Sequence, residues 1–214
     1  SGDSVKFPSV KVQPVAATSG QLQALGIRYV ASRPFRPQPG LQPVARFGAW
    51  GLFRVPASNV NGFSPVEVVR TATDFELFSR MKNPSWVPSR TVFVRDGIGD
   101  LSLVPLRTSR LRFSGSGIGV DAVTDGVSVL LLPIRFSHCL KWRGIASDEH
   151  GPMKIFAANY FQAAILFTGR LSGRFEYDIG GWDAHECYRQ DIARAHATRL
   201  ESKIFERFRR KKTD

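Results

Sequence analysis

The pattern of apolar and polar positions changes character near residue 98. Before it, short apolar runs bounded by turn residues predict strands at 27–31, 50–55, 66–70 and 91–94. Thr73 is a predicted N-cap with Glu76 three residues later, which indicates an amphipathic helix over 73–82. A Pro-rich segment over 33–40 predicts a loop. Strand, helix and strand in this order predict a small α/β layer.

After residue 98, apolar runs separated by glycine turns predict strands at 101–106, 109–114, 118–124, 127–136, 153–158, 162–168 and 171–178. Strands at this spacing are typical of an antiparallel sandwich or jelly roll. An apolar stripe with helical spacing predicts a helix over 183–212. The expected fold class is therefore α+β, with a small α/β subdomain at 1–98, a β-sandwich at 99–182 and a basic amphipathic helix at 183–214.

The run from Gly126 to Trp142 is apolar at first and ends in chemically capable side chains. We expect a buried strand whose far end carries His138, Lys141 and Trp142 as a ligand-binding rim. Tyr177 and Trp182 lie near other predicted strand ends, where flat aromatic side chains can stack on sugars or nucleobases. For any single aromatic residue, packing in the core is the competing interpretation.

The chain has two cysteines, Cys139 and Cys187. In an oxidising compartment they can form one disulfide, and in a reducing one they are ordinary buried thiols. The two cysteines together with His138 and His185 are residue types that bind metals. Their spacing matches no standard zinc motif, so no metal site is predicted. A disulfide and a metal site exclude each other here.

Two further motifs suggest chemistry. Gly115-Ser-Gly-Ile-Gly119 looks like a phosphate loop, but a strand follows it where a helix is needed, so we predict a hairpin turn and no cofactor. Ser137-His138-Cys139 suggests nucleophilic catalysis, but neighbours in a strand point to opposite faces. A hydrolase using His138 remains one alternative.

The net charge of +12 and the pI near 10.4 indicate an anionic partner, either nucleic acid, a lipid surface or an acidic polysaccharide. A generally basic, solvated surface is the competing interpretation. The densest basic block could lie against anionic lipid headgroups, and it consists of Arg207, Arg209, Arg210, Lys211 and Lys212.

Several segments occur in a recognisable order: Leu25–Ser32, Leu52–Pro56, Val66–Phe78, Arg90–Val94 and Leu130–Trp142. Together, over about residues 22–145, they resemble the soluble tails of YfhO-like proteins, which are bacterial multi-spanning membrane proteins of the GT-C glycosyltransferase type. The chain departs from that pattern at one point. Many relatives have a Pro-Gly-Trp turn there, whereas this chain has Ser137-His-Cys-Leu-Lys-Trp142.

The resemblance implies a non-catalytic periplasmic domain, joined in the same polypeptide to a membrane-embedded part at the inner membrane. It implies binding of a glycan or a lipid-linked saccharide in cell-envelope polysaccharide assembly, and it transfers no catalytic residue. The alternatives are a basic nucleic-acid-binding or capsid-like β protein, which the charge and the interleaved aromatic residues favour, and the hydrolase.

Overall fold

The computed structural model describes residues 17–33, 39–95, 98, 101–115, 117–146, 153–177 and 185–197. The elements in chain order are α1 (Ser19–Ala24), β1 (Tyr29–Ser32), β2 (Gln42–Phe47), β3 (Trp50–Arg54), β4 (Glu67–Arg70), α2 (Asp74–Met81), β5 (Thr91–Val94), β6 (Thr108–Ser114), β7 (Gly117–Val123), β8 (Ser128–Arg135), β9 (Leu140–Ala146), β10 (Lys154–Ala158), β11 (Gln162–Phe167) and β12 (Arg170–Tyr177). A further helix spans residues 185–197. None of the helices in these ranges is long and apolar enough to cross a membrane.

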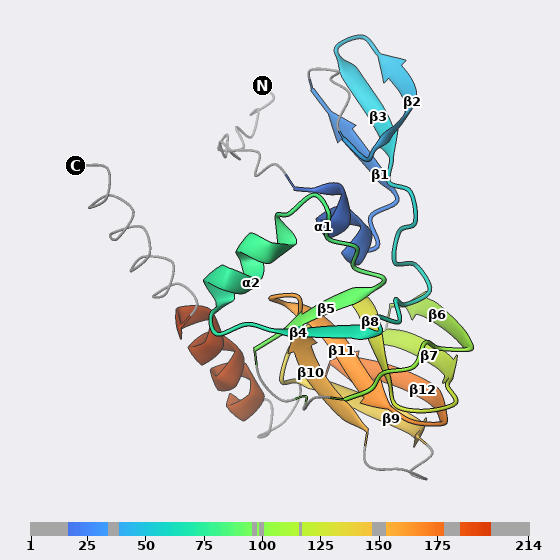
Figure 1. Ribbon diagram of the computed structural model, residues 1–214, viewed down its shortest axis with the longest axis vertical. Helices are drawn as coiled ribbons and strands as arrows, with labels where there is room; N and C mark the ends of the chain where they lie inside the picture. The colour runs from blue at the N-terminus through green and yellow to red at the C-terminus, as the bar shows by residue number, and fades with distance from the viewer. Residues whose placement is uncertain are drawn as a thin grey trace, which may run out of the picture.

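Two antiparallel sheets face each other and form a sandwich (Figure 1). One has the strand order β6-β7-β12-β9 and the other the order β10-β11-β8. Strict alternation in β7 points Ile118, Val120 and Ala122 into the core between them, where Leu130 and Phe175 are fully buried. The α+β class with a β-sandwich and a C-terminal helix, predicted from the sequence, is confirmed.

The sheet containing β8 is buried on both faces, which explains why its sequence is an uninterrupted apolar run. Leu130 and Leu132 belong to the sandwich core, whereas Val129 and Leu131 belong to a second core with Val92. This second core packs the sandwich against β4 and β5, a parallel pair connected through α2. A boundary at residue 98 remains a prediction, and the second core joins side chains from both of its sides.

The predicted helix N-cap is present at α2. The Thr73 hydroxyl accepts a hydrogen bond from the Glu76 backbone N–H at 3.1 Å, and the Glu76 carboxylate accepts one from the Ala72 N–H at 3.0 Å. This carboxylate therefore serves the residue before the N-cap, a small departure from the usual reciprocal pattern. The hydrogen bond from Ala72, followed by that from Arg80, holds the pKa of Glu76 below its ordinary range.

A buried polar junction connects α1, β5, β8 and β11. Gln162 Nε2 donates to the carbonyl oxygens of Ala24 at 2.7 Å and Leu132 at 2.9 Å, and Gln162 Oε1 accepts from Asn159 Nδ2 at 3.0 Å. Asn59 Nδ2 donates to the same Ala24 oxygen at 3.2 Å. Since the last carbonyls of a helix lack partners within it, two side-chain amides here satisfy one at the end of α1.

The junction also explains how β8 tolerates a proline. Pro133 has no N–H for a sheet hydrogen bond, and the pairing of β8 with β11 shifts register between Gln162 and Ala164, opposite this position. The Gln162 side chain bonds the Leu132 carbonyl next to the irregularity. The register irregularity accommodates Pro133, and the Gln162 side chain supplies a donor to the neighbouring Leu132 carbonyl.

A separate three-stranded antiparallel sheet, with the order β1-β3-β2, lies at the opposite end of the molecule's long axis from the sandwich (Figure 1). Its strand β2 directly follows the Pro-rich segment and was not among the sequence-predicted strands. Gln42–Phe47 lacks the apolar run that indicates a strand, and it is ordered by pairing with β3.

Two other expectations differ from the structure. The predicted strand at 101–106 is irregular, because Pro105 interrupts its donors and only isolated backbone bonds, such as Val104 N–H to Val127 O at 2.9 Å, join it to its neighbours. The segment Leu140–Ala146 is a strand that the pattern did not predict. Its outer positions are Lys141, Arg143 and the apolar Ile145, while the inner position 144 is a glycine, so the alternation of apolar and polar residues is broken.

We predict that Gln162→Leu lowers the free energy of unfolding by about 3 kcal/mol, because it removes the side-chain partner of the buried Leu132 carbonyl and of the Asn159 amide and one of the two side-chain donors to the Ala24 carbonyl. Urea denaturation measures this directly. Gln190→Leu is the matched control, since Gln190 is exposed and bonds Glu186 Oε1 at 3.3 Å, and a change within about 0.5 kcal/mol is expected. Equal midpoints for the two variants would contradict the role of the junction.

Candidate functional site

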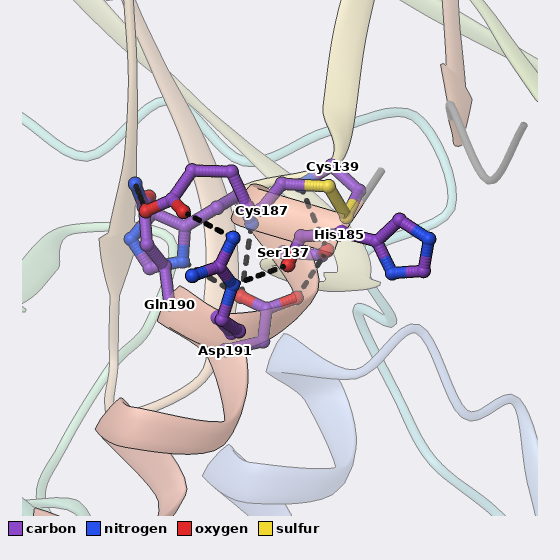
Figure 2. The surroundings of a disulfide bond; sticks show 9 residues. Ser137, Cys139, His185, Cys187, Gln190 and Asp191 are labelled. Carbon is purple, nitrogen blue, oxygen red and sulfur yellow. Dashed lines mark hydrogen bonds and ion pairs between the residues drawn. A yellow bond between two sulfur atoms is a disulfide. The ribbon is translucent and has the colours of Figure 1, made fainter. Parts of the chain in front are cut away.

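A disulfide attaches the helix over residues 185–197 to the sandwich. Cys139 and Cys187 are bonded across 48 positions of the chain, with their Cα atoms 5.1 Å apart (Figure 2). Cys139 is buried in the turn between β8 and β9, and Cys187 is in the first turn of the helix. Both cysteines of the chain are therefore used in this bond.

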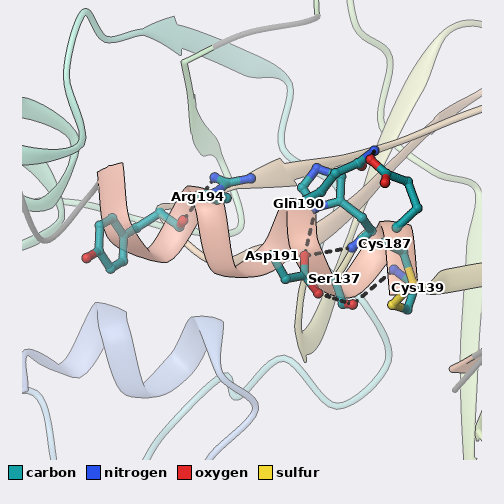
Figure 3. A network of polar contacts seen from close by, with 9 residues as sticks. Ser137, Cys139, Cys187, Gln190, Asp191 and Arg194 are labelled. Carbon is teal, nitrogen blue, oxygen red and sulfur yellow. Dashed lines mark hydrogen bonds and ion pairs between the residues drawn. A yellow bond between two sulfur atoms is a disulfide. The ribbon is translucent and has the colours of Figure 1, made fainter. Parts of the chain in front are cut away.

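One helical turn further on, Asp191 binds the same loop. Its carboxylate accepts hydrogen bonds from the Ser137 hydroxyl at 2.5 Å, from the His138 backbone N–H at 3.0 Å and from His138 Nδ1 at 2.7 Å (Figure 3). The Ser137 hydroxyl oxygen in turn accepts from the Cys139 N–H at 3.0 Å, which closes a local turn. Asp191 thus fixes the conformation of residues 137–139 and the position of the helix together.

Arg194 makes the third attachment. Its guanidinium donates to the backbone carbonyl of Tyr160 at 3.3 Å and lies 5.5 Å from the ring centroid of Phe136, within the range of a cation–π contact. Cys187, Asp191 and Arg194 are spaced by four and three residues, so they lie along one face of the helix. A covalent bond, an ionic contact and a hydrogen bond therefore succeed one another along this face.

The hydrogen bonds around Asp191 determine its ionisation. Burial acts to raise the pKa of its carboxyl, but hydrogen bonds from Ser137 and His138 outweigh that effect and hold the pKa below its ordinary value of 3.8. Nearby, burial raises the pKa of Tyr177, and the negative charge of Asp191 adds to this rise. At neutral pH the site therefore combines a carboxylate with a protonated phenol.

An open cleft of about 460 Å³ lies between this helix and the end of the sandwich. The next stripe of the helix, Tyr188, Ile192 and Ala195, forms one wall. Aromatic side chains dominate the whole lining, and two arginines border it. The lining residues are Arg135, Phe136, Ser137, Tyr160, Phe161, Tyr177, Tyr188, Asp191, Ile192, Arg194 and Ala195.

The wall opposite the helix is a strained turn between β10 and β11. Asn159 has φ of 46° and Tyr160 has φ of 74°, in a left-handed region that costs a non-glycine residue roughly 1–2 kcal/mol. The Asn159 side chain accepts from the Phe93 N–H at 2.9 Å, and the Asn159 N–H donates to the Phe93 carbonyl at 2.8 Å. The buried junction thus holds Tyr160 and Phe161 at the cleft despite the strain.

The residues predicted as a ligand-binding rim are not brought together. His138 is bonded to Asp191 beside the cleft. Lys141 is on the outer face of β9, opposite Glu176. Trp142 packs against Phe175 with ring centroids 4.8 Å apart, and it covers Gly173, where an added Cβ would come within 2.6 Å of the indole. Trp142 therefore has a packing role.

Of the other predicted ligand residues, Tyr177 lines the cleft, is 46% exposed and donates from its hydroxyl to the Arg135 carbonyl at 2.9 Å. Trp182 lies outside the described residues. So does the predicted basic block for an anionic lipid surface, at Arg207, Arg209, Arg210, Lys211 and Lys212.

The geometry also bears on the catalytic and metal alternatives. Nucleophilic catalysis needs a hydrogen bond from the nucleophile to its base, whereas the Ser137 hydroxyl bonds Asp191. The disulfide occupies both sulfur atoms, and His185 points away from Asp191 in Figure 2. The described residues contain no group of three or more His, Cys, Asp or Glu arranged to hold a metal ion.

Sequence reasoning missed Tyr160, Phe161, Asp191 and Arg194 as site residues. Tyr160 and Phe161 come from a hairpin turn, where apolar residues give no periodic signal. Asp191 and Arg194 are part of an ordinary amphipathic helix pattern. The available signal was their spacing from Cys187, because a disulfide there turns that helix face toward the sandwich.

Comparisons with known proteins give no assignment. Scans of this chain against protein-family models, curated proteins and solved structures each find no match. The function must therefore be inferred from the geometry of the site.

We predict that Asp191→Asn lowers the free energy of unfolding at neutral pH by about 1–2 kcal/mol, because hydrogen bonds to a half-buried charge are lost. Since the folded-state pKa of Asp191 is depressed, its contribution is fully present above 3.8 and disappears as the pH falls through the lowered folded pKa. Urea denaturation of the wild type and of Asp191→Asn from about pH 5 to about pH 2 should show their free energies of unfolding converging.

The matched control is Asp125→Asn, since Asp125 is an exposed carboxylate paired with Arg107 at 3.2 Å. An exposed pair of this kind contributes about 0.5 kcal/mol. A difference between wild type and Asp191→Asn that stays constant down to about pH 2 would contradict the assigned role.

Proposed function

We propose that this chain is a non-catalytic domain that binds an acidic saccharide in the cleft beside the helix over 185–197. The observation that carries the proposal is the lining of that cleft, in which five aromatic side chains are combined with Arg135 and Arg194. Its volume of about 460 Å³ is in the usual range for small-molecule sites.

The chemistry of the lining fits a sugar that carries a carboxylate or a phosphate. Aromatic rings pack on the apolar face of a sugar ring while leaving its hydroxyls hydrated. Tyr188 is 62% exposed at the mouth of the cleft, where such a ring can reach it. Arg135 is exposed, and a guanidinium binds carboxylate and phosphate groups through paired hydrogen bonds.

The state of Asp191 supports binding rather than hydrolysis. Glycoside hydrolysis uses two facing carboxyl groups, one of which is protonated. Asp191 is ionised, and its oxygens accept hydrogen bonds from Ser137 and His138. It therefore acts as a structural anion that orients the cleft.

We extend the proposal to location. A disulfide that uses both cysteines supports an oxidising, extracytoplasmic compartment. Together with the resemblance to the tails of YfhO-like proteins, this supports a periplasmic domain joined to a membrane-embedded glycosyltransferase-like part, with an envelope glycan or a lipid-linked saccharide as the ligand.

A basic surface favours nucleic acid as a second candidate ligand. On the outer face of the four-stranded sheet, the pairing register aligns Arg112, Gly119, Arg174 and Arg143 in one row across β6, β7, β12 and β9. A hollow of about 410 Å³ adjoins this row and includes Arg110 and Arg170. These five exposed arginines outnumber Asp121 and Glu176, which pair with Arg112 and Arg143.

We predict that calorimetric titration or a glycan array detects binding of uronic-acid-containing or phosphorylated saccharides. Tyr188→Ala weakens this binding about tenfold, because one stacked ring contributes on the order of 1–2 kcal/mol. Arg135→Gln weakens binding of acidic saccharides and leaves that of neutral ones nearly unchanged.

Two controls match these variants outside the cleft. Phe113→Ala removes an aromatic side chain that is 57% exposed, and Arg107→Gln removes an exposed guanidinium. Neither should change saccharide affinity. If no saccharide binds, and DNA or RNA binds with an affinity that falls steeply with salt and with loss of Arg112 and Arg174, the second candidate replaces the first.

A further inference from the structure

The β2–β3 hairpin exposes aromatic side chains at its turn. Phe47 and Trp50 are cross-strand partners on either side of Gly48 and Ala49, and they are 66% and 50% exposed. Gly48 has φ of +58°, and an added Cβ there would meet nothing within 4 Å, so the turn projects into open space. Burying such side chains in the protein would be favourable, and here they are left in contact with water.

The rest of the same sheet face becomes more polar away from the turn. The register places Leu52 behind the aromatic pair, and Arg54 beyond it with Tyr29 as its partner. Tyr29 is 50% exposed and Arg54 is exposed as well. An apolar tip followed by a tyrosine and an arginine matches the gradient from hydrocarbon to headgroups at a bilayer surface, where amphipathic aromatic side chains and arginines gather.

The segment of the sequence that contains the hairpin carries charges of a single sign. Residues 4–66 contain seven lysines and arginines and no aspartate or glutamate. Within this segment, Arg28, Arg33, Arg46 and Arg54 are exposed, and Arg46 Nε donates to the Gly48 carbonyl at 3.1 Å, next to the turn. Each cation near an anionic lipid surface contributes about 1 kcal/mol, and no carboxylate of this segment opposes that attraction.

The shape of the hairpin favours a membrane over a protein partner. A stable protein interface buries about 800 Å² on each side, which needs a broad or hollowed surface. This tip offers two aromatic side chains on a two-residue turn. A bilayer accepts a small apolar tip because its interior is apolar throughout, and the surrounding arginines gain from the headgroups without any fitted contact.

We propose that the β2–β3 hairpin is a membrane-docking element, which inserts Phe47 and Trp50 into the interface of an anionic bilayer. The arginines around the hairpin bind lipid phosphate groups, and the sandwich at the other end of the molecule stays in the aqueous phase. This inference is independent of the saccharide proposal, because it involves no residue of the cleft.

The test uses the full chain and vesicles made from phosphatidylglycerol mixed with phosphatidylcholine, or from phosphatidylcholine alone. The wild-type protein should co-sediment with the mixed vesicles, and its tryptophan emission should shift to the blue. Replacing both Phe47 and Trp50 by serine should weaken this binding at least tenfold, since the apolar area of two rings is lost. Arg54→Glu should weaken binding to the mixed vesicles only.

Ile145→Ser is the matched control, because Ile145 is 73% exposed on the sandwich, and it should bind as the wild type does. In a second measurement, brominated lipid should quench the tryptophan fluorescence of the wild type and not that of Trp50→Phe. This result would place Trp50 in the bilayer, and it does not depend on the double variant. The proposal is overturned if the wild type does not bind the mixed vesicles, if the double variant binds equally well, or if brominated lipid leaves Trp50 unquenched.

Discussion

The attachment of one helix to the end of the sandwich determines the candidate site. An isolated helix of 13 residues is marginally stable in water, and the helix over 185–197 gains its position from Cys187, Asp191 and Arg194 on a single face. All three attachments to the sandwich use that face of the helix. The adjacent stripe with Tyr188 and Ile192 is left to form the wall of an open cleft.

The opposite wall depends on a different kind of constraint. Gln162 and Asn159 satisfy buried carbonyls and amides from α1, β5 and β8, and they hold a turn in which Tyr160 adopts a strained backbone. Strain of this kind persists when the surroundings over-determine the conformation, and it is concentrated at functional sites. A rigid polar junction on one side and a clamped helix on the other give the cleft a preformed shape, which favours binding because little ordering remains to be done.

The separation along the chain between interacting residues decides which parts of the fold and of the candidate site could be predicted from the sequence. The strands of the sandwich other than β9, and the N-cap at Thr73, depend on local patterning, and the sequence predicts them. Strand β2 is ordered by its pairing with β3, which the local pattern does not show. The segment at 101–106 is irregular because Pro105 removes a backbone donor. The roles of Asp191 and Tyr160 depend on contacts 53 and 34 residues away in the chain, with His138 and Arg194, and no local pattern encodes such contacts. The saccharide, periplasmic and glycosyltransferase assignments remain proposals.

The central claim is that the Cys139–Cys187 disulfide clamps the helix over 185–197 to the sandwich. The most direct test is hydrogen exchange on the wild-type protein and on a variant with both cysteines replaced by serine. Mass spectrometry of the wild type should first show the linked Cys139–Cys187 peptides. The amides of residues 185–197 should then be protected in the wild type and exchange about tenfold faster or more in the variant, while β8 keeps its protection. Equal exchange of the helix in both proteins, or an unprotected helix in the oxidised wild type, would contradict the clamp.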